Sequence, residues 1–186
     1  RMMNEWGVPP VVLHSLLHQY ATRMADKGQR VPALALAGGF AFEDQLFKGL
    51  ALGAPFVKLI GMARAPIAAA MVGKTIGRAI DDHQVPVYVE RFGNSKDEIF
   101  VTSSTLRKEL GNKQFDKLPA GALGLYTYYE RLDQGLRQLM AGSRKFALEH
   151  VSRDDVAALT PEAAEVSGIQ LITDVDRSEV DKILDD

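Results

Sequence analysis

The chain has 186 residues, of which 46% are hydrophobic and 25% are charged, and its formal net charge at pH 7 is -2. This composition is typical of a globular protein with one domain, or with one domain and an extension. The slightly negative net charge gives the chain no excess of basic residues of the kind that binds nucleic acid or an anionic membrane. The chain has no cysteine, which excludes disulfides, thiolate metal sites, iron–sulfur ligation and cysteine nucleophiles within it.

The opening residues, "RMMNEWG", lack the apolar stretch of a secretory signal peptide. No apolar run along the chain reaches the roughly 18 residues that span a bilayer. We therefore expect a cytoplasmic protein whose segment here makes no membrane contact. Because the chain starts on Arg1 and enters structured-looking sequence at once, we also expect it to be a piece of a longer protein.

The first predicted helix covers Pro9–Lys27, with prolines at its entry and Gly28 at its exit. His14 and His18 lie four positions apart on it, but no acidic ligand lies between them and no third candidate is near. We interpret both as structural residues and predict no metal site. Apolar residues at helical spacing predict the buried face, and these are Val12, Leu16, Leu17, Tyr20 and Met24.

Two short apolar runs with a helix between them follow. Val31–Ala37 is a continuous apolar run, typical of a parallel strand buried on both faces, and Phe56–Ile60 predicts a second strand. The helix between them is predicted over Phe42–Leu52, which gives a strand–helix–strand unit with a right-handed crossover. A further alanine-rich helix is predicted over Ala65–Ile80, with small residues that would pack closely against the sheet.

The remainder of the chain predicts helices. A connector at residues 81–95 precedes a short helix in residues 96–110, which Gly111 ends, and the longest helix lies within residues 118–146. Ser152 and Thr160 are each predicted to cap the start of a short helical segment. A short strand is predicted at residues 169–173 and a last helix at residues 176–186. The apolar stripe of the longest helix consists of Leu125, Tyr128, Tyr129, Leu132, Leu136, Leu139 and Met140.

Glycines end both predicted strands, at Gly38-Gly39 and at Gly61, and Arg64 follows the second. Glycine lets backbone N–H groups approach an anion closely, and an arginine at a helix start adds a cation where the helix dipole is positive. The pattern predicts a phosphate site at the carboxyl ends of the strands. The alternative is a tight turn at Gly38-Gly39 and a surface role for Arg64.

A second phosphate-like motif, "MVGKTIG", is not interpreted as a phosphate loop. Gly73-Lys74-Thr75 matches the end of that motif, but Ala68 stands where it requires a glycine, and no strand directly precedes it. We expect Lys74 to face solvent.

Three stretches cover nearly the whole chain and carry a resemblance: "ALALAGGFAFEDQLFKGLALGAPFVKLIGMARAPIAAAMVGKTIG", "GALGLYTYYERLDQGLRQLMAGSRKF" and "SRDDVAALTPEAAEVSGI". They resemble the C-terminal part of the FMN-binding glutamate synthase family. The resemblance implies an α/β fold class, namely the C-terminal portion of a TIM (β/α)8 barrel (its last two βα units) followed by a mostly helical C-terminal extension. It assigns residues 1–82 to the barrel units and residues 83–186 to the extension packed on the barrel.

The resemblance also implies an activity. The family is FMN-dependent, and its flavin passes electrons to the imine of 2-oxoglutarate and ammonia, so that the expected substrates are 2-oxoglutarate and ammonia or glutamine. The positions that match the family's phosphate contacts are Gly38, Gly39, Gly61, Met62, Ala63 and Arg64.

The chain departs from the family in two respects. Typical members ligate an iron–sulfur cluster through cysteines, whereas this chain ligates none, so electron delivery must differ or reside elsewhere. The first six barrel strands are also absent, and two strands cannot close a barrel. We therefore expect a fragment that is inactive alone and depends on the N-terminal part of the barrel, supplied by the same protein or by another chain.

Two alternatives stay open: a flavin barrel oxidoreductase with a different substrate, and a non-catalytic helical interaction module that docks a partner through the Leu125–Met140 stripe. No catalytic residue is assigned. Tyr126, Tyr128 and Tyr129 resemble core and interface aromatics. The acid–base candidates are better interpreted as solvated or capping residues, and they are Glu43, Asp44, His83 and His150.

Overall fold

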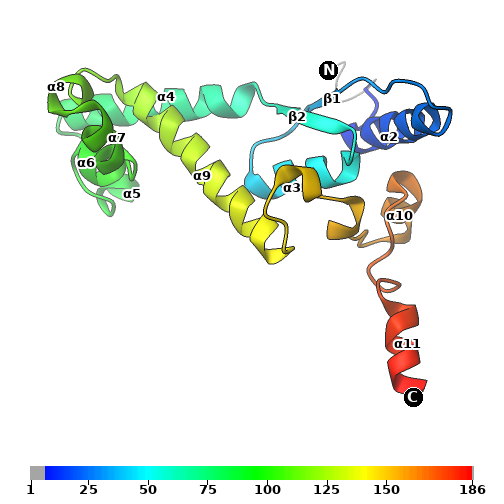
Figure 1. Ribbon diagram of the computed structural model, residues 1–186. Coiled ribbons are helices and arrows are strands. Elements are labelled where there is room, and N and C mark those ends of the chain that lie inside the picture. Colours follow the sequence, from blue (N-terminus) through cyan, green and yellow to red (C-terminus); the bar gives the residue numbers. More distant parts are fainter. Residues whose placement is uncertain (1–6, 186) are drawn as a thin grey trace. The chain divides into compact units, whose positions relative to one another are not determined.

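The computed structural model describes residues 7–185, and this part of the chain is mostly helical (Figure 1). The opening residues, from which the sequence predicts a piece of a longer protein, lie outside the described range. The elements in chain order are α2 (Pro10–Asp26), β1 (Leu34–Ala37), α3 (Glu43–Gly53), β2 (Val57–Gly61), α4 (Arg64–Asp81), α5 (Val87–Glu90), α6 (Lys96–Ile99), α7 (Ser103–Leu110), α8 (Asn112–Phe115), α9 (Ala120–Gly142), the 3-10 turns η1 (Leu148–His150) and η2 (Arg153–Asp155), α10 (Pro161–Ser167) and α11 (Arg177–Asp185).

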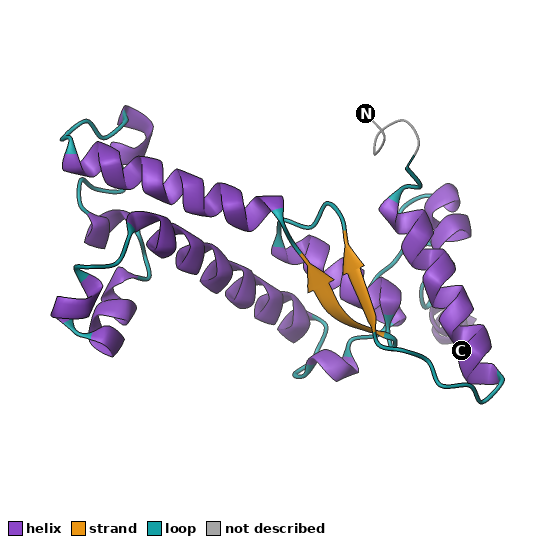
Figure 2. Ribbon diagram, turned by 90° about the horizontal axis from the view of Figure 1, so that it is seen from above, coloured by secondary structure: helices purple, strands orange, loops and turns teal. Residues whose placement is uncertain are grey.

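The two strands, β1 and β2, pair in parallel and form a two-stranded sheet (Figure 2). Leu34 lies opposite Val57 and Ala37 lies opposite Gly61, with an irregularity in register after Leu34. α3 connects the strands, and it packs against β2. The predicted strand–helix–strand unit is therefore confirmed, although each strand is shorter or later than predicted.

The predicted fold class is wrong, because the chain is not a portion of a TIM (β/α)8 barrel. Helices take up 62% of the described residues, which hold one sheet of two strands, four and five residues long. A barrel strand has a neighbour on each side and is covered on both faces. Here each strand has one neighbour, and only Leu36 in β1 and Val57 in β2 are buried. The apolar run at residues 31–37 is therefore not a strand buried on both faces.

The described chain divides into two compact units. Unit 1 combines residues 7–61 with residues 137–185, and unit 2 is Met62–Leu136. The resemblance implies a domain boundary between residues 82 and 83. This boundary stays a prediction, although the barrel fold implied for residues 1–82 is wrong.

Unit 1 packs α2, α3 and α10 together, with η2 against α3. The guanidinium of Arg153 in η2 donates hydrogen bonds to the carbonyl oxygens of Leu52, near the end of α3, and Ser167, at the end of α10. The buried hydrophobic residues of unit 1 come from both of its chain segments. They are Ala21, Leu36, Leu46, Phe47, Ala51, Leu52, Ala54, Val57, Met140, Val151 and Ala158.

The first helix, α2, is confirmed in extent but buries a different face from the one predicted. Leu16 and Tyr20 are 54% and 66% exposed, whereas His14, Ser15 and Ala21 are buried. The spacing of apolar residues therefore identified the helix but not its contacts, because two of the three buried residues are polar.

Unit 2 is built on the close approach of α4 and α9, which run in opposite directions (Figures 1 and 2). A Cβ added at Gly73 would lie 2.6 Å from the carbonyl oxygen of Ala120, and one added at Gly77 would lie 2.3 Å from the Ala120 Cβ. A Cβ added at Gly124 would lie 2.9 Å from the Gly73 Cα. The small residues of α4 therefore pack against α9, not against the sheet as predicted, and "MVGKTIG" is a helix-packing motif.

The apolar core of unit 2 lies beside this helix pair. Buried side chains from α7, α8 and α9 meet the residue that follows α6. The buried members of the cluster are Phe100, Leu106, Phe115 and Leu123, and Ile76, Leu118, Ala120 and Tyr126 pack against them.

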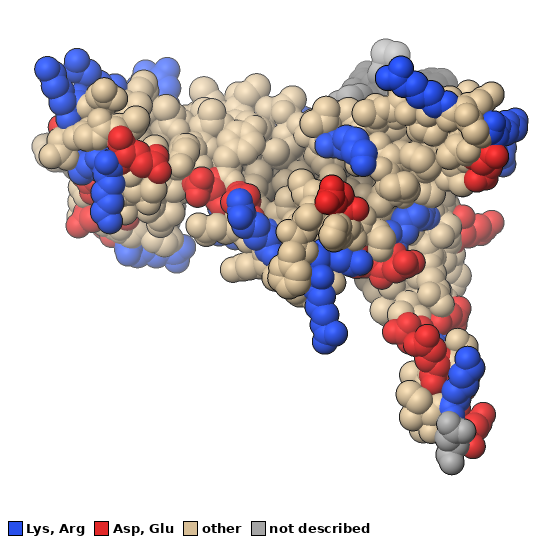
Figure 3. Space-filling view, viewed as in Figure 1, with Lys and Arg blue, Asp and Glu red and all other residues tan. Residues whose placement is uncertain are grey.

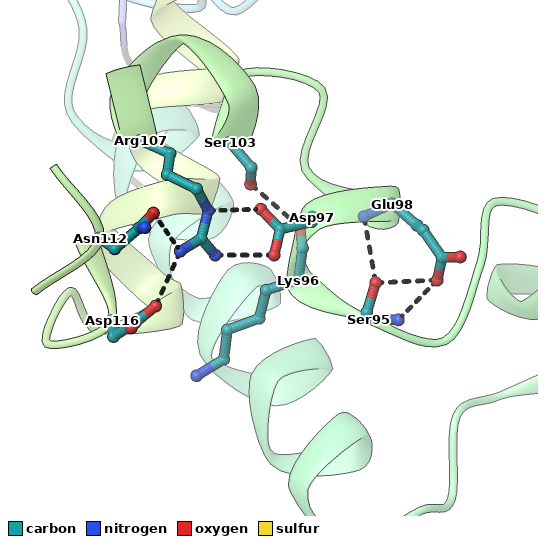
Figure 4. A network of polar contacts seen from close by, with 8 residues as sticks. All are labelled: Ser95, Lys96, Asp97, Glu98, Ser103, Arg107, Asn112 and Asp116. Atoms are coloured by element: carbon teal, nitrogen blue, oxygen red, sulfur yellow. Dashed lines mark hydrogen bonds and ion pairs between the residues drawn. The ribbon is translucent and has the colours of Figure 1, made fainter. Parts of the chain in front are cut away.

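A polar network around Arg107 joins α6, α7 and α8 (Figure 4). The Arg107 guanidinium donates hydrogen bonds to both carboxylate oxygens of Asp97, at 3.2 and 2.8 Å, and to the Asp116 carboxylate at 3.0 Å. The same guanidinium lies 4.1 Å from the centroid of the Phe115 ring. The single short helix predicted over residues 96–110 is two helices, α6 and α7, separated by residues 100–102. The Ser103 hydroxyl donates a hydrogen bond to the Lys96 carbonyl oxygen across this break.

Candidate functional site

The predicted phosphate site begins at the carboxyl edge of the small sheet. Ala37 ends β1 and lies opposite Gly61, which ends β2, so Gly38 and Gly39 leave the sheet at the edge where Gly61 lies. Gly38 has φ 122° and Gly39 has φ 81°. Both values lie in the region that strongly favours glycine, so the chain conformation here requires these residues.

Gly61 has a packing reason of its own. A Cβ at this position would lie 3.2 Å from the Ala37 Cβ and 3.6 Å from the Leu36 carbonyl oxygen. The bare backbone therefore lets the ends of the two strands approach each other closely.

The other predicted phosphate contacts are Met62, Ala63 and Arg64. They directly follow Gly61 in the sequence and belong to unit 2. Arg64 is exposed and is the first residue of the 18-residue helix α4. The Met62 sulfur accepts a hydrogen bond from the Tyr128 hydroxyl at 3.7 Å. A joint phosphate site of all six predicted residues stays a prediction.

Gly38 and Gly39 line a pocket of about 250 Å³ within unit 1, which we call the glycine pocket. Residues of α2 and α3 form the rest of its wall, together with the start of the loop after the glycines. The full lining is Pro10, Val11, His14, Gly38, Gly39, Phe40, Gln45, Lys48, Gly49 and Leu52.

Buried His14 is the titratable group on the α2 side of the glycine pocket. Its ring stacks on Phe40, with 6.0 Å between the ring centroids and 6° between the planes. Burial lowers the pKa of His14 below its usual value of 6.5, so its imidazole is neutral at pH 7. It therefore presents a neutral aromatic surface with one donor and one acceptor.

Lys48 contributes the positive charge of the glycine pocket. Its ammonium lies 2.7 Å from the Asp44 carboxylate, one helical turn earlier. The hydrogen bond from Lys48 lowers the pKa of Asp44. Because both side chains are exposed, this ion pair is weak and leaves Lys48 free to turn towards an anion.

Gln45 fixes the loop that follows the glycines. Its side-chain oxygen accepts hydrogen bonds from the backbone N–H groups of Ala41, at 2.8 Å, and Phe42, at 3.2 Å. His14, Gln45 and Lys48 were not predicted as site residues from the sequence. A Gln at the third position of α3 is a recognisable capping signal, but the approach of α2 to this loop is set by tertiary packing.

The remaining acid–base candidates do not converge. Glu43 is the first residue of α3, and its Oε2 atom is buried with no hydrogen-bond partner among the described residues. His83 lies exposed after α4 with φ 53°, and His150 lies exposed 3.5 Å from Glu149. Residues 7–185 contain no group of three or more His, Asp or Glu side chains arranged for a metal ion.

His18 and the tyrosines have structural contacts. The His18 ring is hydrogen-bonded to the Ala54 carbonyl oxygen at 3.0 Å, and burial, with a smaller effect of Arg153, lowers its pKa. Tyr128 and Tyr129 pack edge to face, with 5.6 Å between their ring centroids.

Comparisons with protein-family models, curated proteins and solved structures found no match to the chain. The resemblance to the FMN-binding glutamate synthase family therefore stays a prediction. Within the part of the chain that the structure describes, every helix is too short or too polar to cross a bilayer.

Proposed function

We propose that this chain binds the phosphate end of FMN and serves a cytoplasmic, FMN-dependent oxidoreductase of the glutamate synthase type. That reaction aminates 2-oxoglutarate reductively to glutamate, with nitrogen from ammonia or glutamine. The observation that carries the proposal is the pair Gly38-Gly39, which has positive φ values at the carboxyl end of β1 and lines a pocket. The resemblance of the sequence supplies the identity of the cofactor and the reaction.

The residues of the glycine pocket fit a phosphate group. A Cβ added at Gly39 would meet no atom within 4 Å, so the bare backbone faces open space that an anion can enter. The volume of about 250 Å³ holds a phosphate but is smaller than the roughly 300–1,000 Å³ of sites that enclose a whole small molecule. We therefore assign the phosphate end of the cofactor, and not the flavin ring, to this pocket.

The residues of this pocket bind and orient, and none of them is proposed to react. The backbone N–H groups of Gly38 and Gly39 donate to the phosphate, and Lys48 adds a positive charge. Gln45 holds the following loop in place through its two backbone hydrogen bonds. FMN, once bound and reduced by an electron donor, would supply the two electrons for the reduction. Arg64, exposed at the start of α4, is a proposed phosphate contact on the strength of the sequence pattern and of the resemblance.

The two alternatives differ in what supports them. A flavin enzyme with another substrate would use the same phosphate contacts, so only an assay of the reaction separates it from the proposal. The helical interaction module would use the α9 stripe, in which Leu132 and Met140 are 4% and 8% exposed, whereas Tyr129 and Leu139 are 46% and 36% exposed. Part of that stripe is therefore buried within the chain and part is open to a partner.

Titration with FMN, followed by the quenching of flavin fluorescence, tests the phosphate site. We expect FMN to bind the chain and riboflavin, which lacks the phosphate, to bind at least about tenfold more weakly. Equal binding of FMN and riboflavin would contradict a phosphate site. Formation of glutamate from 2-oxoglutarate and ammonia by the protein that carries this chain, with a chemical reductant, tests the substrate separately.

A further inference from the structure

A hollow in unit 2 lies between α4 and the start of α9, and we call it the α4–α9 pocket. Its volume is about 540 Å³, which lies within the range of sites that enclose a whole small molecule. Gly77 of α4 and Gly121 of α9 belong to its lining, at the place where the two helices approach each other closely. None of its residues belongs to the glycine pocket, so it is a separate site.

Three cations and one carboxylate line the α4–α9 pocket. Lys74 and Arg78 lie four positions apart on α4, Lys96 comes from α6, and Asp81 is the acidic residue. Like charges four apart on a helix repel each other, yet among the described residues Lys74, Arg78 and Lys96 make no ion pair that would offset this. The pocket therefore carries an excess of two positive charges, which an anion would neutralise.

Figure 4 shows where one of these cations, Lys96, is placed. In Figure 4 the Lys96 side chain extends away from Asp97 and Glu98, towards the ribbon of α4. The Lys96 ammonium therefore makes none of the contacts drawn around Arg107, which Lys96 joins only through its carbonyl oxygen. In Figure 3, Lys and Arg side chains are prominent over the end of unit 2 formed by α7, α8 and the adjoining end of α4, whereas uncharged side chains cover the middle of α4.

The start of α9 adds hydrogen-bond donors to the same pocket. Pro119, Ala120 and Gly121 line it, and the 23-residue helix begins at Ala120 with no acidic residue in its first turn. The N–H groups of a first turn have no acceptor within the helix, and the helix dipole favours an anion there. Cations of α4 and α6 and the first residues of α9 thus line one cavity.

Apolar atoms make up the rest of the lining. Ala70 and Met71 of α4 and Pro119 before α9 give the pocket a hydrophobic wall. A free inorganic anion would leave this wall in contact with water, whereas an anion that carries an apolar group would cover it. From the charge, the donors and this wall, we infer that the α4–α9 pocket binds a small organic phosphate.

Phenyl phosphate is a suitable probe, because it joins one phosphate to one apolar ring. We expect a titration of the 15N-labelled chain with phenyl phosphate to shift the amide signals of Ala120 and Gly121. The double variant Lys74→Gln/Arg78→Gln should bind it at least about tenfold more weakly, since two charge-assisted contacts are lost. Inorganic phosphate should bind the unchanged chain at least about threefold more weakly than phenyl phosphate, because it cannot cover the apolar wall.

The matched control is Lys108→Gln/Lys113→Gln, which makes the same change in net charge at exposed positions outside the pocket. Its affinity should stay within about twofold of the unchanged chain, as expected for distant charges screened by salt. Equal loss in both double variants, or signals of Ala120 and Gly121 that stay still, would overturn the inference. Equal affinities for inorganic and phenyl phosphate would overturn the assignment to an organic phosphate. Gly39→Ala should leave this titration unchanged, so the test does not depend on the FMN proposal.

Discussion

The guanidinium of Arg153 donates a hydrogen bond to the carbonyl oxygen of Leu52 at 2.5 Å, across 101 positions of the chain. A second donor of the same group reaches the Ser167 carbonyl oxygen. The last carbonyl groups of a helix have no partner within it and carry partial negative charge. One cation therefore satisfies the ends of α3 and α10 together and joins the two segments of unit 1.

Replacing this cation should destabilise unit 1. Arg153→Met keeps an unbranched apolar stem but leaves the Leu52 and Ser167 carbonyl oxygens without their donors. We expect the free energy of unfolding to fall by about 2 kcal/mol, measured by urea unfolding followed by circular dichroism. The control is Arg177→Met, which removes an exposed ion pair with Asp174 at 4.0 Å and should change stability by less than about 0.5 kcal/mol. Equal effects of the two substitutions would contradict the bridging role of Arg153.

The glycine pocket can be tested with two glycines that share a positive φ and open space at the Cβ position. Gly39 and Gly28 both have positive φ, 81° and 67°, and a Cβ at either position meets nothing within 4 Å. Gly39→Ala and Gly28→Ala should therefore each lower stability by about 1 kcal/mol through backbone strain. Only Gly39→Ala should weaken FMN binding, because only Gly39 lines the pocket. A similar loss of FMN affinity in both variants would show that strain, and not the pocket, is responsible.

The helix pair of unit 2 should not tolerate an added methyl group. Alanine is a better helix former than glycine by about 1 kcal/mol, so Gly73→Ala would stabilise an isolated α4. In the protein the new Cβ would lie 2.6 Å from the Ala120 carbonyl oxygen, which forces α4 and α9 apart, and we expect a lower melting temperature. Gly142→Ala on α9 meets no atom within 4 Å and should not lower it. A melting temperature unchanged or raised by Gly73→Ala would contradict the close packing.

Buried His14 should make stability depend on pH. Because its pKa is lowered in the folded state, the unfolded chain binds more protons between that lowered value and the usual 6.5. The stabilisation is complete above 6.5 and is lost as the pH falls through this window. His14→Phe keeps the ring against Phe40 but removes the titration, so its melting temperature should fall less between about pH 7.5 and pH 5. Exposed His150→Gln is the control and should follow the unchanged chain.

The Arg107 network should distinguish arginine from lysine. Lysine has no planar fork, so Arg107→Lys loses the paired hydrogen bonds to Asp97 and weakens the contact with the Phe115 ring. We expect a lower melting temperature for Arg107→Lys and no change for Arg131→Lys, an exposed arginine on α9. Identical melting curves for the two variants would contradict a stabilising role for the network.

Local signals in the sequence were sufficient for most of the helices. Proline at the start of α2, Thr160 and Pro161 at the start of α10 and Gly111 after α7 act within one or two turns, so their effect can be predicted without the tertiary structure. The helices α3, α4 and α9 were predicted to within a few residues.

The fold class and the contacts between helices could not be predicted, because they depend on segments that lie far apart in the chain. Two apolar runs that end in glycine are compatible with a barrel and with a two-stranded sheet, because the difference is the number of neighbouring strands. His14 is buried because the loop with Phe40 packs over it, and Gly73 is needed because α9 crosses there. For the candidate site, the turn glycines could be predicted, whereas the side chains that close the glycine pocket could not.

The discontinuous make-up of unit 1 has a consequence for synthesis on the ribosome. Met62–Leu136 is contiguous and can complete its packing as soon as it emerges. Residues 7–61 must wait for Arg153 and α10, which are translated about a hundred positions after α3. During that interval the apolar residues of the βαβ segment lack part of their cover, which leaves them open to aggregation or to a chaperone.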